Sequence, residues 1–149
     1  MPGCTFNVSG ENFDVDDFLS TVDWEINFIY RKGEVSERRP EYTYDESGFG
    51  MTVSESDGFL YEELEDVERF LDEKHSYIQR LRTKYNADEM SFDFGYYCRL
   101  YDSNENCVCF SQGESIEPSI LKKCGDLGIR IDLSLYQWPS EEPKRRNEA

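Results

Sequence analysis

Residues 59–85 read FLYEELEDVERFLDEKHSYIQRLRTKY, and this stretch decides the fold. Its apolar side chains recur every three or four residues, which is the spacing of one helix face. The stripe consists of Leu60, Leu64, Val67, Leu71, Lys74, Ile78, Leu81 and Tyr85, and only Lys74 among them is polar. Acidic residues crowd the first half and basic residues the end, the charge order that a helix dipole favours. The spacing predicts one long helix from about 59 to 85.

A coiled coil is the alternative for this stretch, because heptads show the same alternation of three- and four-residue steps. The pattern, however, ends before four heptads are complete, and Lys74 occupies one of its core positions. We therefore favour a long helix that packs on a β-sheet.

The rest of the chain contains short segments in which apolar and polar residues alternate, as in half-buried strands. Strands are predicted at 4–9, 24–30, 49–54, 92–101, 107–110 and 129–136. Short helices are expected at 14–21 and from Pro118 to about Gly125 or Gly128. Each strand has one apolar face, which helices must cover. This order predicts an α+β fold: a largely antiparallel sheet with the long helix and two short helices packed mainly on one face.

The residues after the long helix are predicted to form a β-hairpin with a turn of Asp, Ser and Asn residues. In its register Cys98 faces Cys109 and Leu100 faces Cys107, so that three thiols share one face. These cysteines could hold a soft metal, form a cross-strand disulfide or fill the apolar face. The last interpretation is favoured because their spacing matches no standard zinc motif.

The 149 residues include 32 acids and 16 bases, for a net charge of -16. So negative a chain repels phosphates and anionic lipids, and we therefore predict neither nucleic acid nor a membrane as partner. No apolar stretch is long enough to span a bilayer. The 10 Tyr, 10 Phe and 2 Trp side chains supply the burial that a disordered chain lacks.

The length suits one domain, which we place at residues 1–138. The segment 139–149 holds as many basic as acidic residues and is predicted to be a disordered charged tail, so the domain carries the whole net charge. The chain opens without the basic and apolar regions of a secretory signal, and its five cysteines contain no CxxC pair. Both features predict a reduced protein of the cytoplasm.

The sequence offers no convincing catalytic, cofactor or metal site, and we predict none. The only histidine, His75, lies at the border of the helical stripe, where a satisfied or solvent-facing side chain is the favoured interpretation. The basic residues Arg31, Lys32, Arg38 and Arg39 alternate with glutamates. Local charge neutralisation is therefore favoured over anion binding.

Several landmarks along residues 4–136 resemble the domain-of-unknown-function family 4279, a mainly bacterial group. They are Gly10-Glu11-Asn12-Phe13-Asp14 after the first strand, Arg31-Lys32-Gly33-Glu34, Gly48-Phe49, and the run from Leu127-Gly128 to Tyr136. The resemblance implies a small single domain and brings no established activity or catalytic residue. Some relatives look like immunity proteins of bacterial toxin systems, which is an analogy of fold and context.

We therefore expect a non-enzymatic protein-binding module, of the immunity or inhibitor type, that acts on a basic toxin or nuclease. The candidate partner-binding residues are Glu62, Glu65, Asp66 and Glu68 in the acidic half of the long helix. Acids there would pair with basic side chains of the partner. The alternative is that they only complement the helix dipole and keep the surface soluble.

Two other functions stay open at this point. One is a small ligand-binding or enzymatic domain with a pocket between sheet and helices, to which Tyr97, Arg99 or the thiols contribute. The other is a subunit that homodimerises through a sheet edge or the helix face around Lys74. The sequence does not decide between monomer and homodimer.

Overall fold

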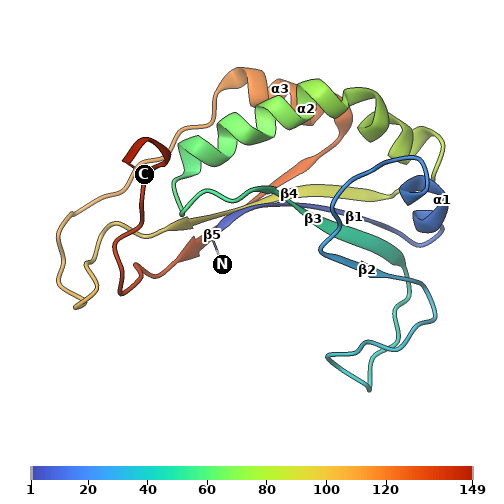
Figure 1. Cartoon of the computed structure of the whole chain (residues 1–149), viewed down its shortest axis with the longest axis horizontal. Helices are drawn as coiled ribbons and strands as arrows, with labels where there is room; N and C mark the ends of the chain where they lie inside the picture. Colours follow the sequence, from blue (N-terminus) through green and yellow to red (C-terminus); the bar gives the residue numbers. More distant parts are fainter. Residues whose placement is uncertain (1, 149) are drawn as a thin grey trace.

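The computed structural model, which describes residues 2–148, contains one five-stranded mixed sheet (Figure 1). Its strands are β1 (Gly3–Gly10), β2 (Phe28–Tyr30), β3 (Ser47–Ser54), β4 (Glu89–Tyr97) and β5 (Arg130–Tyr136). They lie in the order β2-β3-β1-β4-β5. Three of the four pairings are antiparallel, and β5 runs parallel to β4. The predicted α+β fold with a largely antiparallel sheet is confirmed.

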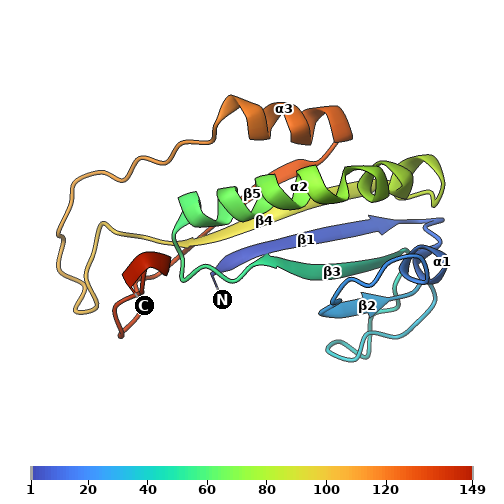
Figure 2. The same cartoon turned by 45° about the horizontal axis from the view of Figure 1, so that its top comes forward.

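The helices are α1 (Val15–Leu19), α2 (Leu60–Thr83), α3 (Pro118–Leu127) and the short 3-10 helix η1 (Arg146–Glu148). Figures 1 and 2 show α2 and α3 next to each other over the same face of the sheet. The predicted long helix is confirmed as α2, whose stripe from Leu60 to Leu81 is buried except near Lys74. Within residues 2–148, no helix is both long and apolar enough to cross a membrane.

Aromatic rings fill the space between the sheet and the helices. The Phe6 ring of β1 lies 4.9 Å from Phe92 of β4 and 5.6 Å from Phe70 of α2, measured between ring centroids. At the other end of the core, Phe18 of α1 stacks on Phe49 of β3 at 5.9 Å. Aromatic side chains therefore supply the burial that the composition predicts.

The strand predicted at 24–30 is mostly absent, because only its last three residues form β2. The Trp24 ring lies 5.3 Å from Phe18 and 5.6 Å from Phe70, so it packs into the core. The apolar alternation of this segment thus reflects burial beside α1 and α2, and the chain reaches the sheet edge only at Phe28.

The predicted hairpin after α2 is wrong. The outer edge of β4 pairs with β5, with Phe92 opposite Ile131, and residues 107–110 form no strand. What exists of the hairpin is one bridge between Tyr101 and Cys107, with backbone hydrogen bonds from Asp102 to Asn106 at 3.0 Å and from Val108 to Leu100 at 2.9 Å. Since α3 carries the chain back along the sheet before β5 begins, β5 joins β4 in parallel.

The C-terminal segment, predicted to be disordered, lies against the start of α2 in the structure (Figure 1). Met1 and Ala149, which the predicted domain and tail include, lie outside the described residues.

Candidate functional site

The four acidic residues predicted to bind a partner are divided between two sides of α2. Glu62 and Asp66, one helical turn apart, both meet the C-terminal segment. Glu68 lies on the other flank, where its carboxylate accepts a hydrogen bond from Nζ of Lys123 in α3 at 3.0 Å. Glu65 is exposed. The structure therefore brings Glu62 and Asp66 together, whereas Glu68 links two helices.

Arg146 occupies the site that Glu62 and Asp66 form. Its guanidinium donates to both carboxylate oxygens of Asp66, at 3.1 and 2.6 Å, and its backbone N–H donates to Oε1 of Glu62 at 2.9 Å. The side chains of Asp66 and Glu62 expose only 14% and 5% of their surface. Hydrogen bonds to Asp66 raise the pKa of Arg146, which keeps it charged. A bidentate ion pair with a carboxylate that is shielded from solvent is among the stronger polar contacts in proteins.

Two serines hold these carboxylates in place. Ser54 at the end of β3 donates its hydroxyl to Oδ2 of Asp66 at 2.7 Å. Ser56, in the loop before α2, donates to Oε2 of Glu62 at 3.0 Å. Because both serines belong to the domain itself, their hydrogen bonds can orient the carboxylates without a contribution from Arg146.

The residues before Arg146 also contact the start of α2. The backbone N–H of Lys144 donates to Oδ2 of Asp57 at 2.7 Å. The guanidinium of Arg145 lies 5.4 Å from the centroid of the Phe59 ring, within the range of a cation–π contact. Pro143 is buried. Consecutive residues of the C-terminal segment thus follow the first turns of the helix.

Glu63, which the sequence does not distinguish from its acidic neighbours, is fully buried beneath α2. Neither of its carboxylate oxygens has a hydrogen-bond partner among the described residues. The pKa of Glu63 is raised to about 8, chiefly by burial; the backbone of Gly3 acts to lower it, and the negative charges of Asp93 and Asp66 add to the rise. The carboxyl group is therefore mostly protonated at neutral pH.

The predicted register of the three clustered cysteines is wrong. The backbone N–H of Cys98 donates to the carbonyl of Tyr136 at 2.7 Å, so β5 lies where Cys109 was expected. Cys107 does not face Leu100 across a hairpin, and both Cys107 and Cys109 are exposed. These two thiols therefore do not fill the core.

Apolar filler is instead the role of Cys4 and Cys124, which are buried. Burial raises the pKa of the Cys124 thiol to about 11, and that of Cys4 rises for the same reason. Both thiols are thus poor nucleophiles at neutral pH. Among residues 2–148, no three His, Cys, Asp or Glu side chains are grouped to hold a metal ion, and His75 is exposed.

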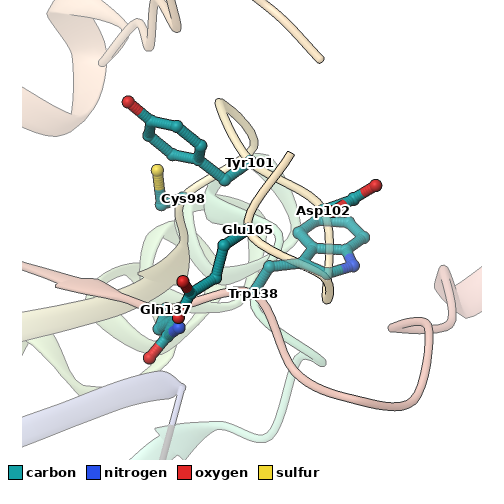
Figure 3. Close-up of a pocket in the computed structure, with 6 residues that line it drawn as sticks. All are labelled: Cys98, Tyr101, Asp102, Glu105, Gln137 and Trp138. Atoms are coloured by element: carbon teal, nitrogen blue, oxygen red, sulfur yellow. The ribbon is translucent and has the colours of Figure 1, made fainter. Parts of the chain in front are cut away.

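A hollow of about 410 Å³ lies in the loops beyond β4 and β5 (Figure 3). It is lined by Cys98, Tyr101, Asp102, Glu105, Gln137 and Trp138. Figure 3 shows these side chains spread apart, with the Tyr101 and Trp138 rings directed to opposite sides. The Asp102 carboxylate accepts hydrogen bonds from the backbone of Asn104 and Asn106, each at 2.9 Å, which organise the turn. The polar groups do not converge on a common point.

The residues expected to line a ligand pocket lie near this hollow. The Tyr97 ring packs edge-on against Trp138 at 6.0 Å between ring centroids. Arg99 pairs with Glu114 at 2.6 Å. They therefore lie at the end of the sheet, whereas core side chains fill the space between sheet and helices.

Two residues of the basic cluster of the first half, Arg31 and Lys32, are paired with acids. Arg31 donates to Asp16 at 2.8 Å and also approaches Glu34 at 3.5 Å. Lys32 donates to Glu11 at 3.1 Å. These pairs support local neutralisation for Arg31 and Lys32, whereas the Arg39 guanidinium lies 5.1 Å from the centroid of the Tyr42 ring.

Large apolar side chains are exposed at the end of the molecule where α2 begins. They are Tyr101, Val108, Phe110, Leu133 and Leu135. Figures 1 and 2 place the loop after β4, the end of β5 and the C-terminal segment together at this end. Exposed apolar groups beside charged ones are typical of protein-binding surfaces. We call this part of the molecule, with the Glu62–Asp66 site, the α2-start end.

Comparison with known proteins shows a family and no function. The profile of a domain of unknown function (DUF4279) matches residues 2–138, a range that holds the sheet and all three α-helices. No curated protein and no solved structure matches the chain. The matched range stops before Arg146. As its sequence landmarks predict, the chain belongs to the family of the domain of unknown function DUF4279.

Proposed function

We propose that the protein is a non-enzymatic protein-binding module of the bacterial cytoplasm, an immunity or inhibitor protein that docks onto a basic toxin or nuclease. The observation that carries the proposal is the α2-start end, which carries both exposed apolar side chains and two shielded carboxylates. Such a surface can anchor a partner by its apolar groups and select a basic one by its charge.

Inhibition works by occlusion in this proposal. The substrate-binding groove of a nuclease is rich in Lys and Arg, because it must hold phosphates. Acidic side chains at the α2-start end pair with those bases, while Phe110 and Val108 are covered by the partner. The net charge of -16 speeds encounter with a positively charged protein.

One feature supports docking over turnover, and another supports the cytoplasm as the compartment. The hollow between Tyr101 and Trp138 has no convergent polar groups to act on a substrate. All five cysteines are free, as is usual in a reducing compartment.

The test uses two valines of equal exposure at opposite ends of the molecule. Val108, in the loop after β4, and Val35, in the loop after β2, both expose 58% of their surface. Figure 1 shows these two loops at opposite ends of the molecule. The intact chain is used as bait for capture from cell extract, and affinity for the recovered protein is then measured. Val108→Ser and Phe110→Ser should each weaken binding by roughly 5- to 30-fold, the loss of an apolar anchor.

Val35→Ser is the matched control and should change the affinity by less than about twofold, since it lies away from the proposed surface. The recovered partner should be basic. An acidic partner, or equal losses from Val108→Ser and Val35→Ser, contradicts the proposal.

A second candidate, a small ligand-binding domain, is favoured by the hollow of about 410 Å³ with its two aromatic rings. A volume of that order suits a small organic molecule. A change in Trp138 fluorescence on addition of a metabolite mixture, absent in Trp138→Leu, would support it over docking.

A further inference from the structure

The C-terminal segment meets the domain through four consecutive residues. Pro143 is buried, the Lys144 backbone donates to Asp57, the Arg145 guanidinium lies over Phe59, and Arg146 pairs with Asp66 and Glu62. Side-chain and backbone groups are both contacted. The domain thus contacts the backbone of this segment as well as its charged side chains.

The Arg146 position favours arginine over lysine. A guanidinium can donate to both oxygens of one carboxylate, as it does to Asp66, whereas an ammonium acts as a point charge. Glu62 accepts the backbone N–H of the same residue, which fixes where along the segment the arginine must stand. Pro143, three residues earlier, fixes the other end.

The domain supplies its own hydrogen bonds to the two carboxylates of the site. Ser54 and Ser56 orient the two carboxylates from β3 and the following loop. Asp57, Phe59, Glu62 and Asp66 all precede or open α2, within ten residues of sequence. The C-terminal segment, in contrast, reaches them from beyond the range that the family profile covers. The segment therefore occupies the site as a bound peptide would, although it belongs to the same chain.

We infer that Asp57, Phe59, Glu62 and Asp66 form a recognition site for a short basic segment of a partner protein with the pattern Pro-x-x-Arg, and that residues 143–146 fill this site until the partner displaces them. The inference deepens the proposed function and rests on it for the existence of the partner. It adds the chemistry that the partner presents, a proline followed three residues later by an arginine.

Tethering makes the attached segment a strong competitor. Only four residues separate Trp138, which packs on Tyr97, from Pro143. A short tether gives an effective concentration in the millimolar range, so a free segment of equal intrinsic affinity binds the intact chain weakly. A partner must offer further contacts, such as those with the exposed apolar side chains, to prevail.

The experiment measures binding of a fluorescent peptide, PSEEPKRRNEA, which has the sequence of residues 139–149. Fluorescence anisotropy is recorded with three full-length chains: wild type, Arg146→Ala, and Arg146→Ala combined with Asp66→Asn. In Arg146→Ala the attached segment loses its guanidinium contacts and vacates the site. Asn at 66 can still accept the Ser54 hydroxyl, so the second change removes the charge and preserves the local fold.

Arg146→Ala should bind the peptide at least about tenfold more tightly than wild type, because the tethered competitor is weakened. Adding Asp66→Asn should abolish that gain. A second peptide, with alanine at the position of Arg146, should not bind any of the three chains, and this control does not depend on how the variants fold. A lysine in the same place should bind at least about fivefold less tightly than arginine.

Equal binding by wild type and Arg146→Ala, or equal binding of the arginine and alanine peptides, overturns the inference. Its failure is distinguishable from that of the proposed function. If no variant binds the arginine peptide more tightly than the alanine peptide, but a basic partner is still captured through Val108 and Phe110, the recognition site is disproved and the proposed function is retained. If the peptide binds as expected and no basic partner is captured, the site stands and the function falls.

Discussion

At the residue scale, Glu63 is the side chain least compatible with its surroundings. It is fully buried, has no hydrogen-bond partner among residues 2–148, and has a pKa raised to about 8. The folded protein therefore holds a proton that the unfolded chain releases near pH 4.5. The contribution of this proton to the free energy of unfolding is fully present below pH 4.5 and is lost as pH rises through the pKa of the folded protein.

Glu63→Gln should flatten the pH dependence of folding. Between pH 4.5 and about 8, the wild type should lose up to about 1.4 kcal/mol of unfolding free energy per pH unit through this group. Glutamine keeps the size of the protonated side chain and cannot ionise, so the variant should be the more stable protein at pH 8. Urea unfolding at pH 5, 6, 7 and 8 measures the difference.

Glu65→Gln is the matched control, because Glu65 is exposed on the same helix. It should leave the pH dependence close to that of the wild type. If Glu63→Gln has the wild-type slope, the carboxyl group is not protonated in the folded protein.

Single residues are also where the sequence is least informative. Glu63 stands among Glu62, Glu65 and Asp66, and its place beside the apolar stripe marks it only weakly for burial. Composition likewise predicts disorder for the segment of Arg146. The contact of Arg146 with Asp66 joins residues 80 positions apart and therefore leaves no local pattern in the sequence. Neither environment follows from local pattern, because both depend on how distant parts of the chain meet.

At the scale of elements, α3 ends where its sequence says it should. Gly128 follows Leu127 with φ of +68°, the left-handed conformation that commonly closes helices. A Cβ atom at this position would lie 3.0 Å from Cζ of Arg82, whose guanidinium donates to the Gly128 carbonyl at 2.6 Å. The backbone conformation therefore favours glycine, whereas the flexible end of the Arg82 side chain can shift to admit a methyl group.

Gly128→Ala should lower the free energy of unfolding by about 1–2 kcal/mol, the cost of a left-handed residue with a side chain. Gly125→Ala lies within α3, and a methyl group there would meet no atom within 4 Å. This second change should instead raise the free energy of unfolding by about 0.5–1 kcal/mol. Thermal or urea unfolding of the pair provides the comparison. The same sign for both changes contradicts this account of the helix end.

Elements differ in how far the sequence predicts them. The α2 stripe is visible because helical period and burial coincide over 24 residues. The hairpin prediction failed because alternation in β4 indicates a strand without naming its neighbour. Both 107–110 and 129–136 alternate as strands do, and only the path of the chain through α3 brings 130–136 alongside β4.

At the scale of the whole molecule, charge and apolar exposure are unevenly distributed. The domain carries the net charge of -16, and its exposed apolar groups include several at the α2-start end. The basic residues of the C-terminal segment lie at that same end, against Glu62 and Asp66. The proposed binding surface, the α2-start end, is thus the part of the molecule where opposite charges of the same chain already form contacts.

The most direct test of docking by charge is the association rate constant with the captured partner at 50 and 300 mM NaCl. Electrostatic attraction should make this rate fall by at least about tenfold between the two concentrations, with a much smaller change in the dissociation rate. An association rate that is unchanged by salt would contradict the central claim.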